Sequence, residues 1–229
     1  MRPIDLGRPV GQAHPPFIIA ALDCRELGTL ERAIAAIDAA AASNVDAIKF
    51  ARMPWAWSLR LIQRAEARNL KMLVTALDED AVARFDWLGA PAFYLVFDWS
   101  DLDLVARAAQ TGKPVVMQVG TASEVELAEV VATAHANGNG GIALVQSVID
   151  VDLEGLEALR RHGTVVGIAD RSSCQQIPMA AISKGASIVE KRFSLVGERT
   201  LSPAQIGPVV REIEQAWASL GDDRRWTVN

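Results

Sequence analysis

Residues 165–174 read VVGIADRSSC, an apolar run that ends abruptly in a carboxylate and a guanidinium side by side. A short run with no alternation of polar and apolar residues is typical of a strand that is buried on both faces. Such strands belong to parallel sheets covered by helices. The stretch therefore predicts an α/β fold, and it raises the question of what Asp170 and Arg171 bind at the end of their strand.

Similar β-rich runs recur along the chain, and an amphipathic stretch that fits a helix follows each of them. The full set is FIIAAL (17–22), AIKFA (47–51), KMLVTA (71–76), AFYLVF (92–97), PVVMQVG (114–120), IALVQSV (142–148), VVGIAD (165–170) and IVEKRF (188–193). Ser123, Ser173 and Ser202 each precede a Glu or Gln by three residues, the spacing of a helix capping box.

Eight strand–helix repeats in about 200 residues favour a closed (β/α)8 TIM barrel, compact and single-domain, over an open doubly wound sheet. No G-x-G-x-x-G motif follows the first run, which weighs against a dinucleotide-binding sheet. We expect an N-terminal arm at 1–15, the barrel at 16–221 and a C-terminal tail at 222–229.

Composition excludes several classes of partner. The net charge of −5 offers no general attraction to nucleic acid or to an anionic membrane. No apolar run approaches the length of a membrane span, so we expect a cytoplasmic location. The two cysteines, Cys24 and Cys174, form no disulfide framework. None of the three histidines follows an apolar run, so we expect no metal and no other cofactor.

In a (β/α)8 barrel the active site forms at the C-terminal ends of the strands. This rule gives Asp23, Asp170 and Glu190 as catalytic candidates. The ligand-binding candidates are Lys49, Arg52, Gln118, Gln146, Arg171, Ser172, Lys191 and Arg192. Thr75, Asp78, Asp98, Ser147, Ser173 and Arg199 also follow strands.

Lys49 is unusual among these candidates, because it lies between Ile48 and Phe50 in a buried strand. A buried ammonium needs an anionic partner, which is either a carboxylate of the protein or a ligand. The same alternatives apply to Glu190 and Lys191, for which an internal ion pair between barrel strands is the favoured one.

From about Pro16 to Gly221 the chain resembles the sialic acid synthase family. The matching stretches are PFIIA, DAIKF, GIALVQSV, VVGIADRSS, GASIVEKRFSL and the long run LGAPAFYLVFDWSDLDLVARAAQTGKPVVMQVGTASEVELAEVV. The resemblance implies a barrel that condenses phosphoenolpyruvate with an amino sugar such as N-acetylmannosamine, and a dimer, which is usual for relatives.

The chain departs from that family at the residues that carry its chemistry. The resemblance implies metal-binding histidines at two positions, which here are Gln146 and Arg171, and a third histidine where Arg192 stands. Gln118 falls in the segment that binds phosphate in the family, Tyr94 replaces a lysine, and no antifreeze-like domain is expected. Arginine cannot bind a metal, because it stays protonated. Lys49, Asp170, Glu190 and Lys191 match the family's motif residues.

Three functions remain open. In the first, the arginines and Lys49 bind a phosphorylated or carboxylated small molecule without metal, in sugar-acid or surface-polysaccharide biosynthesis. In the second, Arg171 and Arg192 pair with Asp170 and Glu190, and the barrel is an inactive scaffold or partner subunit. In that case Trp55, Trp57, Trp99 and Trp226 belong to interfaces, although Trp55 and Trp57 would equally suit a lid. The third is a conventional phosphoenolpyruvate-dependent synthase.

Overall fold

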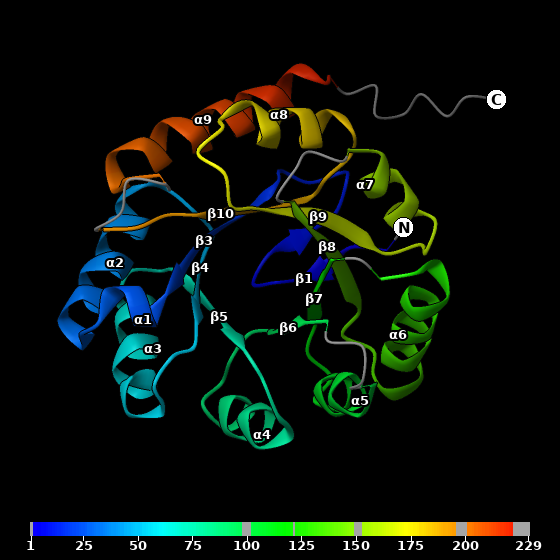
Figure 1. Ribbon diagram of the computed structural model, residues 1–229, viewed down its shortest axis with the longest axis horizontal. Helices are drawn as coiled ribbons and strands as arrows, with labels where there is room; N and C mark the ends of the chain where they lie inside the picture. Colours follow the sequence, from blue (N-terminus) through cyan, green and yellow to red (C-terminus); the bar gives the residue numbers. More distant parts are fainter. Residues whose placement is uncertain (1, 98–101, 121, 149–152, 196–200, 222–229) are drawn as a thin grey trace.

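The computed structural model describes residues 2–97, 102–120, 122–148, 153–195 and 201–221. These residues form a closed barrel of parallel strands inside a ring of helices (Figure 1). The barrel strands are β3 (Phe17–Asp23), β4 (Ala47–Ala51), β5 (Lys71–Thr75), β6 (Phe93–Val96), β7 (Val115–Val119), β8 (Ile142–Val148), β9 (Val165–Asp170) and β10 (Ile188–Arg192). They follow the order of the sequence, and β10 closes the barrel by pairing with β3. The predicted TIM barrel is confirmed.

The helices that surround the barrel are α1 (Cys24–Leu27), α2 (Leu30–Ala42), α3 (Ser58–Ala67), α4 (Glu79–Trp87), α5 (Leu102–Gln110), α6 (Glu124–Asn137), α7 (Leu153–Arg160), α8 (Gln176–Ser183) and α9 (Pro203–Ser219), with a 3-10 turn at Trp55–Trp57. Several of them, among them α2, α4 and α6, start at a residue whose side chain accepts from an amide of the first turn. Ser123 and Ser202 cap α6 and α9 as predicted. The expectation for Ser173 is wrong, because Gln175 occupies the N-cap of α8.

Alternate residues of each strand face two different apolar layers. The inner layer fills the barrel and contains Ile19, Ala47, Val116, Ala169 and Ile188 from five of the strands. Their sequence neighbours, such as Ile48 and Val189, pack outward against the helices. Because side chains alternate along a strand, position parity decides which polar residues can reach the mouth of the barrel.

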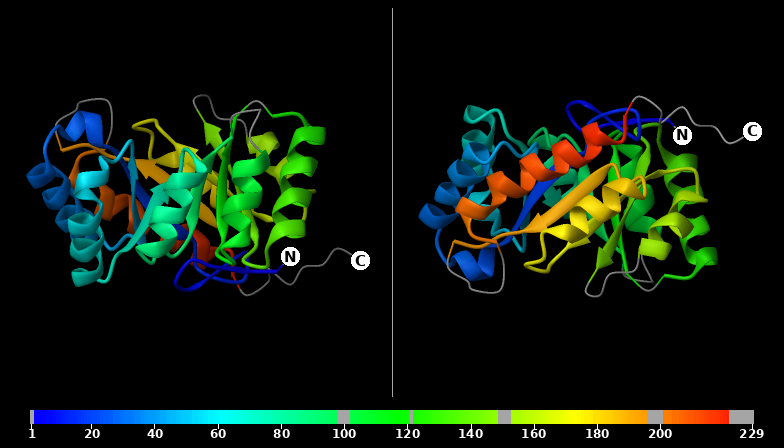
Figure 2. Two further views of the ribbon diagram at one scale, coloured as in Figure 1. Left: turned by 90° about the horizontal axis from the view of Figure 1, so that it is seen from below. Right: turned by 90° about the horizontal axis from the view of Figure 1, so that it is seen from above.

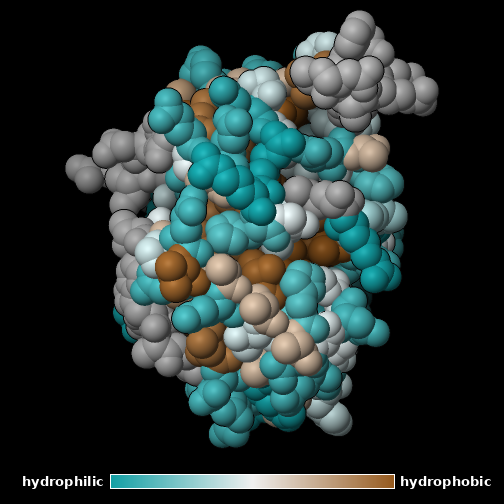
Figure 3. Space-filling model, turned by 90° about the vertical axis from the view of Figure 1, so that its right-hand side faces the viewer, coloured by the Kyte–Doolittle hydropathy of each residue, from teal (hydrophilic) through white to brown (hydrophobic). Residues whose placement is uncertain are grey.

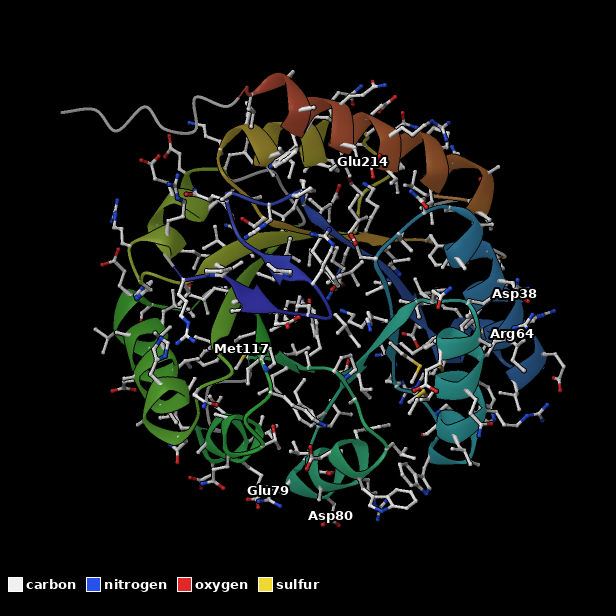
Figure 4. The ribbon with its side chains drawn as sticks, turned by 180° about the vertical axis from the view of Figure 1, so that it is seen from behind. Asp38, Arg64, Glu79, Asp80, Met117 and Glu214 are labelled. Carbon is white, nitrogen blue, oxygen red and sulfur yellow. The ribbon has the colours of Figure 1, made fainter. Side chains whose placement is uncertain are left out.

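The N-terminal arm forms a small hairpin of β1 (Ile4–Asp5) and β2 (Pro9–Val10). Figure 2 shows this hairpin at one end of the barrel, and Figure 4 shows it across the middle of the ring. Leu6 and Val10 are fully buried in the inner apolar layer. The Arg8 guanidinium fixes the hairpin by donating to Asp46 and to the carbonyl oxygens of Pro15 and Pro16. The arm thus closes the end of the barrel opposite to the strand carboxyl ends.

Outside the barrel, ion pairs join neighbouring helices. Asp38 of α2 accepts from Arg64 of α3 (Figure 4), and the hydrogen bond from Arg64 lowers the pKa of the Asp38 carboxyl. Asp38 also accepts from Arg68, the residue that follows α3. The face over α6 and α7 is mostly hydrophilic, with hydrophobic residues scattered across it (Figure 3). Among the described residues, no helix is long and apolar enough to cross a membrane.

Candidate functional site

A buried ion pair lies at the carboxyl-end mouth of the barrel. Lys49 Nζ of β4 donates to Glu190 Oε1 of β10 at 2.6 Å. Both residues share parity with the inner apolar layer, lying two positions after Ala47 and Ile188. Their side chains keep 7% and 8% of their accessible surface, so solvent reaches both at the floor of the mouth. Lys49 therefore finds its anionic partner within the protein.

Tyr94 of β6 completes this floor. The Lys49 ammonium lies 3.7 Å from the centroid of the Tyr94 ring, a cation–π contact. The Tyr94 hydroxyl donates to Gln118 Oε1 of β7 at 3.2 Å. Burial, reinforced by the nearby Glu190 carboxylate, raises the pKa of the Tyr94 hydroxyl well above its usual value. Sequence reasoning treated Tyr94 only as a lost lysine, and its alternation with Phe93 and Leu95 was the signal that it faces inward.

Two arginines act on this floor electrostatically. Burial lowers the pKa of the Lys49 ammonium, Glu190 opposes that shift, and the positive charges of Arg171 and Arg192 lower the pKa further. Arg192 pairs with Glu26 of α1. Arg171 is exposed, and no acidic side chain among the described residues pairs with it. Among the described residues, the mouth therefore carries one guanidinium that has no acidic partner.

Asp23 and Arg52 form a second ion pair at the rim. The Arg52 guanidinium donates through Nε and Nη2 to the Asp23 carboxylate, which also accepts from the backbone amide of Arg25. Arg52 has a φ of 53°, in the left-handed region that few side chains adopt. Asp23 caps α1, so its expected catalytic role competes with a structural one.

Asp170 and Lys191 lie on the opposite side of the sheet from the mouth. Lys191 Nζ donates to Asp170 Oδ2 at 2.5 Å and to the carbonyl oxygens of Ser172 and Cys174 at 2.8 Å each. Ser172 N donates to Asp170 Oδ1, and the Ser172 hydroxyl accepts from Cys174 N. With 2% and 0% of their side chains exposed, neither Lys191 nor Asp170 can contact a ligand at the mouth, which corrects that expectation.

Gln146 was expected to bind a ligand at the mouth, but its side chain lies on the side of the sheet that faces the helices. Its register partners are Val119 and Ile168, which belong to the layer between strands and helices, so its side chain shares that side. Its Oε1 atom is buried and has no hydrogen-bond partner among the described residues. The inward residue at this level of β8 is Ser147, which pairs with Ala169.

The residues present do not fit the divalent metal that the family resemblance implies. Gln146 points away from the mouth, and Arg171 replaces the second histidine with a permanent cation. The carboxylates of Asp23, Asp170 and Glu190 are each held by a basic side chain. Within the described parts of the chain, no three His, Cys, Asp or Glu residues gather as a metal site would require.

The arginine pairing expected for a closed scaffold is not observed. Asp170 pairs with Lys191, and Glu190 pairs with Lys49. Arg192 pairs with Glu26 of α1 instead. The internal ion pairs between strands that were expected for Glu190 and Lys191 are present. Glu190 pairs with Lys49 of β4 and Lys191 with Asp170 of β9, because the two side chains lie on opposite faces of β10. Asp98, Trp99, Arg199 and Trp226 lie outside the described residues.

A cleft of about 210 Å³ adjoins the mouth between the loops after β4 and β5. Trp55 lines it and is 47% exposed, with its ring edge-on to Phe85 and the Arg84 guanidinium over its face. Trp57 instead packs partly buried against the outer apolar layer. A larger hollow of about 480 Å³ lies at the opposite end, beside the hairpin, where the barrel rule places no chemistry.

Comparison with known proteins agrees with this barrel. The chain is 27% identical to a pseudaminic acid synthase of Helicobacter pylori over 63% of its own length and 45% of that protein. It is 25% identical to the spore coat polysaccharide biosynthesis protein SpsE of Bacillus subtilis, over 81% of its own length and 61% of SpsE. The chain thus spans about half to two thirds of these two relatives.

Solved structures give the same result. The crystal structure of SpsE from Bacillus subtilis has a TM-score of 0.86 and 25% identity, and the match covers 93% of this chain and 71% of that one. The N-acetylneuraminic acid synthetase of Leptospira borgpetersenii also has a TM-score of 0.86, at 24% identity, with 93% and 87% coverage, and supports the fold. The NeuB family matches residues 29–225. With its sialic acid synthase-like barrel, the chain belongs to the NeuB family.

Proposed function

We propose that the barrel binds a phosphorylated or carboxylated small molecule at its carboxyl-end mouth, without a divalent metal, in the biosynthesis of a sugar acid or surface polysaccharide. The observation that carries this proposal is Arg171, an exposed guanidinium within electrostatic reach of Lys49 and Tyr94. A guanidinium matches the oxygens of a phosphate or carboxylate in a two-pronged hydrogen bond. The biosynthetic context is inferred from the relatives named pseudaminic acid synthase and SpsE.

The charges at the mouth support the choice of an anion. Lys49 and Glu190 cancel as a pair, and so do Arg192 with Glu26 and Arg52 with Asp23. Among the described residues, Arg171 is then in excess by one positive charge, and Gln118, which accepts from the Tyr94 hydroxyl, adds an amide to the floor. A bound anion would compensate Arg171 and lie above Lys49.

The test is a titration of the protein with inorganic phosphate, phosphoenolpyruvate and a sugar phosphate, with and without manganese, followed by tryptophan fluorescence. We expect saturable binding that does not depend on manganese and that weakens about 10- to 100-fold in Arg171→Ala, the effect of losing a hydrogen bond to a charged group. Arg161→Ala is the matched control, because Arg161 is an exposed arginine paired with Glu124 and is not among the charges that shift the pKa of Lys49. Equal affinity in both variants, or no binding at all, would contradict the proposal.

A second candidate is the inactive scaffold or partner subunit, which the exposed Trp55 favours, since tryptophan is enriched in protein interfaces. Trp55→Ala would then weaken association with a partner and leave anion binding unchanged. The conventional synthase is favoured by the family alone. It predicts manganese-dependent release of phosphate from phosphoenolpyruvate in the presence of an amino sugar.

A further inference from the structure

The Lys49 amine lies in surroundings that differ from those of an ordinary ion-paired lysine. Its ammonium contacts a single carboxylate oxygen, Glu190 Oε1, and the face of the Tyr94 ring. The other oxygen, Glu190 Oε2, is buried without a hydrogen-bond partner among the described residues. A carboxylate that is half satisfied in a buried site is costly unless a ligand or substrate group completes it.

Lys191 provides a comparison within the same strand region. It is as deeply buried as Lys49, but its three ammonium hydrogens have three acceptors, Asp170 and the carbonyl oxygens of Ser172 and Cys174. The protein thus satisfies all three hydrogens of this ammonium. Lys49 has one carboxylate oxygen and an aromatic ring, and it retains contact with solvent at the mouth. The two lysines therefore differ in how completely the protein satisfies their ammonium hydrogens.

We infer that Lys49 is the amine of an imine-forming site for a small carbonyl compound that carries a carboxylate or phosphate, of which a 2-oxo acid is the simplest. The inference rests on the proposed function, because the excess positive charge of Arg171 would hold the anionic group of the substrate above Lys49. A lysine that is desolvated and lies near other cations is the kind that attacks carbonyl carbons.

The proton balance closes with Glu190 alone. Lys49 passes one proton to Glu190 Oε1 across 2.6 Å, and the neutral amine attacks the carbonyl carbon. A C–N bond forms while the C=O π electrons move to oxygen. One of the two amine protons then moves to that oxygen, which gives a carbinolamine with one hydrogen left on nitrogen. Glu190 then returns its proton to the hydroxyl group, which leaves as water. The product is a protonated imine with the Glu190 carboxylate beside it, and no oxidant or metal is needed.

Burial and the two arginines, which lower the pKa of Lys49, act in the direction that this chemistry requires. Each unit by which an amine pKa falls raises the neutral fraction at neutral pH about tenfold. Tyr94 keeps its proton at neutral pH and adds no negative charge, so it does not oppose the neutral amine.

The experiment uses the intact wild-type chain. The protein is incubated with pyruvate, with glyoxylate or with the uncharged ketone acetone, each in the presence of sodium cyanoborohydride, and the reduced adducts are located by peptide mass spectrometry. The chain has only five lysines, Lys49, Lys71, Lys113, Lys184 and Lys191, so each is assigned separately. Phosphate binding is measured on the same sample by tryptophan fluorescence.

We expect the pyruvate and glyoxylate adducts on Lys49 at a rate at least about tenfold above that of exposed Lys71 or Lys184, and no adduct on Lys191. Acetone, which lacks the anionic group, should label Lys49 more slowly. Glu190→Gln keeps the shape of the site and should slow the adduct about 100-fold, the usual effect of losing a general acid–base group. Lys49→Arg should abolish the adduct at that position while it retains the charge.

Adducts spread evenly over the exposed lysines, or none on Lys49, would overturn the imine site. If phosphate still binds in that case, the anion site stands and only the imine chemistry is wrong. If phosphate does not bind and no adduct forms, both the imine site and the proposed function fail. The wild-type mapping depends on no variant, so misfolding of Lys49→Arg or Glu190→Gln cannot obscure the result.

Discussion

Lys191 Nζ lies 2.5 Å from Asp170 Oδ2, and this buried pair fastens the end of β9 to β10 on the side that faces the helices. The same ammonium holds the backbone of Ser172 and Cys174, so the turn after β9 is wrapped around one cation. Arg171, between these anchored residues, is the charged member of the segment that acts on the mouth. The abrupt charged end of the strand thus combines one structural residue and one that faces the candidate site.

Removing this anchor should be costly. Lys191→Met leaves the Asp170 carboxylate buried without its cation, and we expect the free energy of unfolding to fall by about 3–5 kcal/mol. Lys184→Met, on an exposed lysine just after α8, should change it by less than about 0.5 kcal/mol. Urea unfolding followed by circular dichroism measures both. A similar small change in the two variants would show that the Lys191 pair contributes little.

The pH dependence of Tyr94 can be followed alone, because it is the single tyrosine of the chain. Its pKa is raised from 10.0 by burial and then by Glu190, so the folded protein keeps a proton that the unfolded chain loses near pH 10. This group therefore contributes stability that is complete below pH 10 and is lost as pH rises through the folded pKa.

Spectrophotometric titration should accordingly show tyrosinate absorbance near pH 10 in denaturant and only at clearly higher pH in the native protein. Circular dichroism checks that the protein is still folded at pH 10. If tyrosinate forms near pH 10 in the folded protein, Tyr94 is in contact with water and not in the barrel interior.

The two cysteines should differ in reactivity. Burial raises the pKa of the Cys24 thiol to about 12, and its side chain is almost wholly covered, whereas Cys174 is partly exposed. Only a thiolate reacts readily with a disulfide reagent. We expect Ellman's reagent to modify Cys174 alone in native protein and Cys24 only after unfolding. Cys174→Ser serves as the control and should remove the native reaction completely.

The N-terminal hairpin should behave as part of the core. Leu6 is fully buried in the inner apolar layer, so Leu6→Ala should lower the free energy of unfolding by about 2–5 kcal/mol. Leu59→Ala removes the same atoms from a leucine of α3 that is 53% exposed and should cost far less. Chemical denaturation compares the two. If Leu6→Ala were as mild as Leu59→Ala, the hairpin would contribute little to the core.

Much of the barrel could be predicted because its strands are short apolar runs with clear breaks. Three of the eight predicted strands, 47–51, 142–148 and 165–170, match the observed bounds, and the others differ by one residue at either end or both. The hairpin at residues 4–10 was missed, since two strands of two residues carry no periodicity to detect. The helix start at Ser173 was wrong although Ser173 and Gln176 have the spacing of a capping box. That spacing does not reveal that Lys191 binds the backbone carbonyl of Ser172 in the turn after β9.

The sequence by itself determined the eight-strand barrel, the buried lysine in β4 and the absence of histidines from the ends of the apolar runs, since these depend on local pattern and residue identity. Only the tertiary structure decided which charge meets which. Glu190 and Lys191 are neighbours in sequence, yet they face opposite sides of β10 and pair with residues from different strands, Lys49 and Asp170. Alternation within a strand and register between strands fix those partners, and register is a property of the closed barrel rather than of any segment.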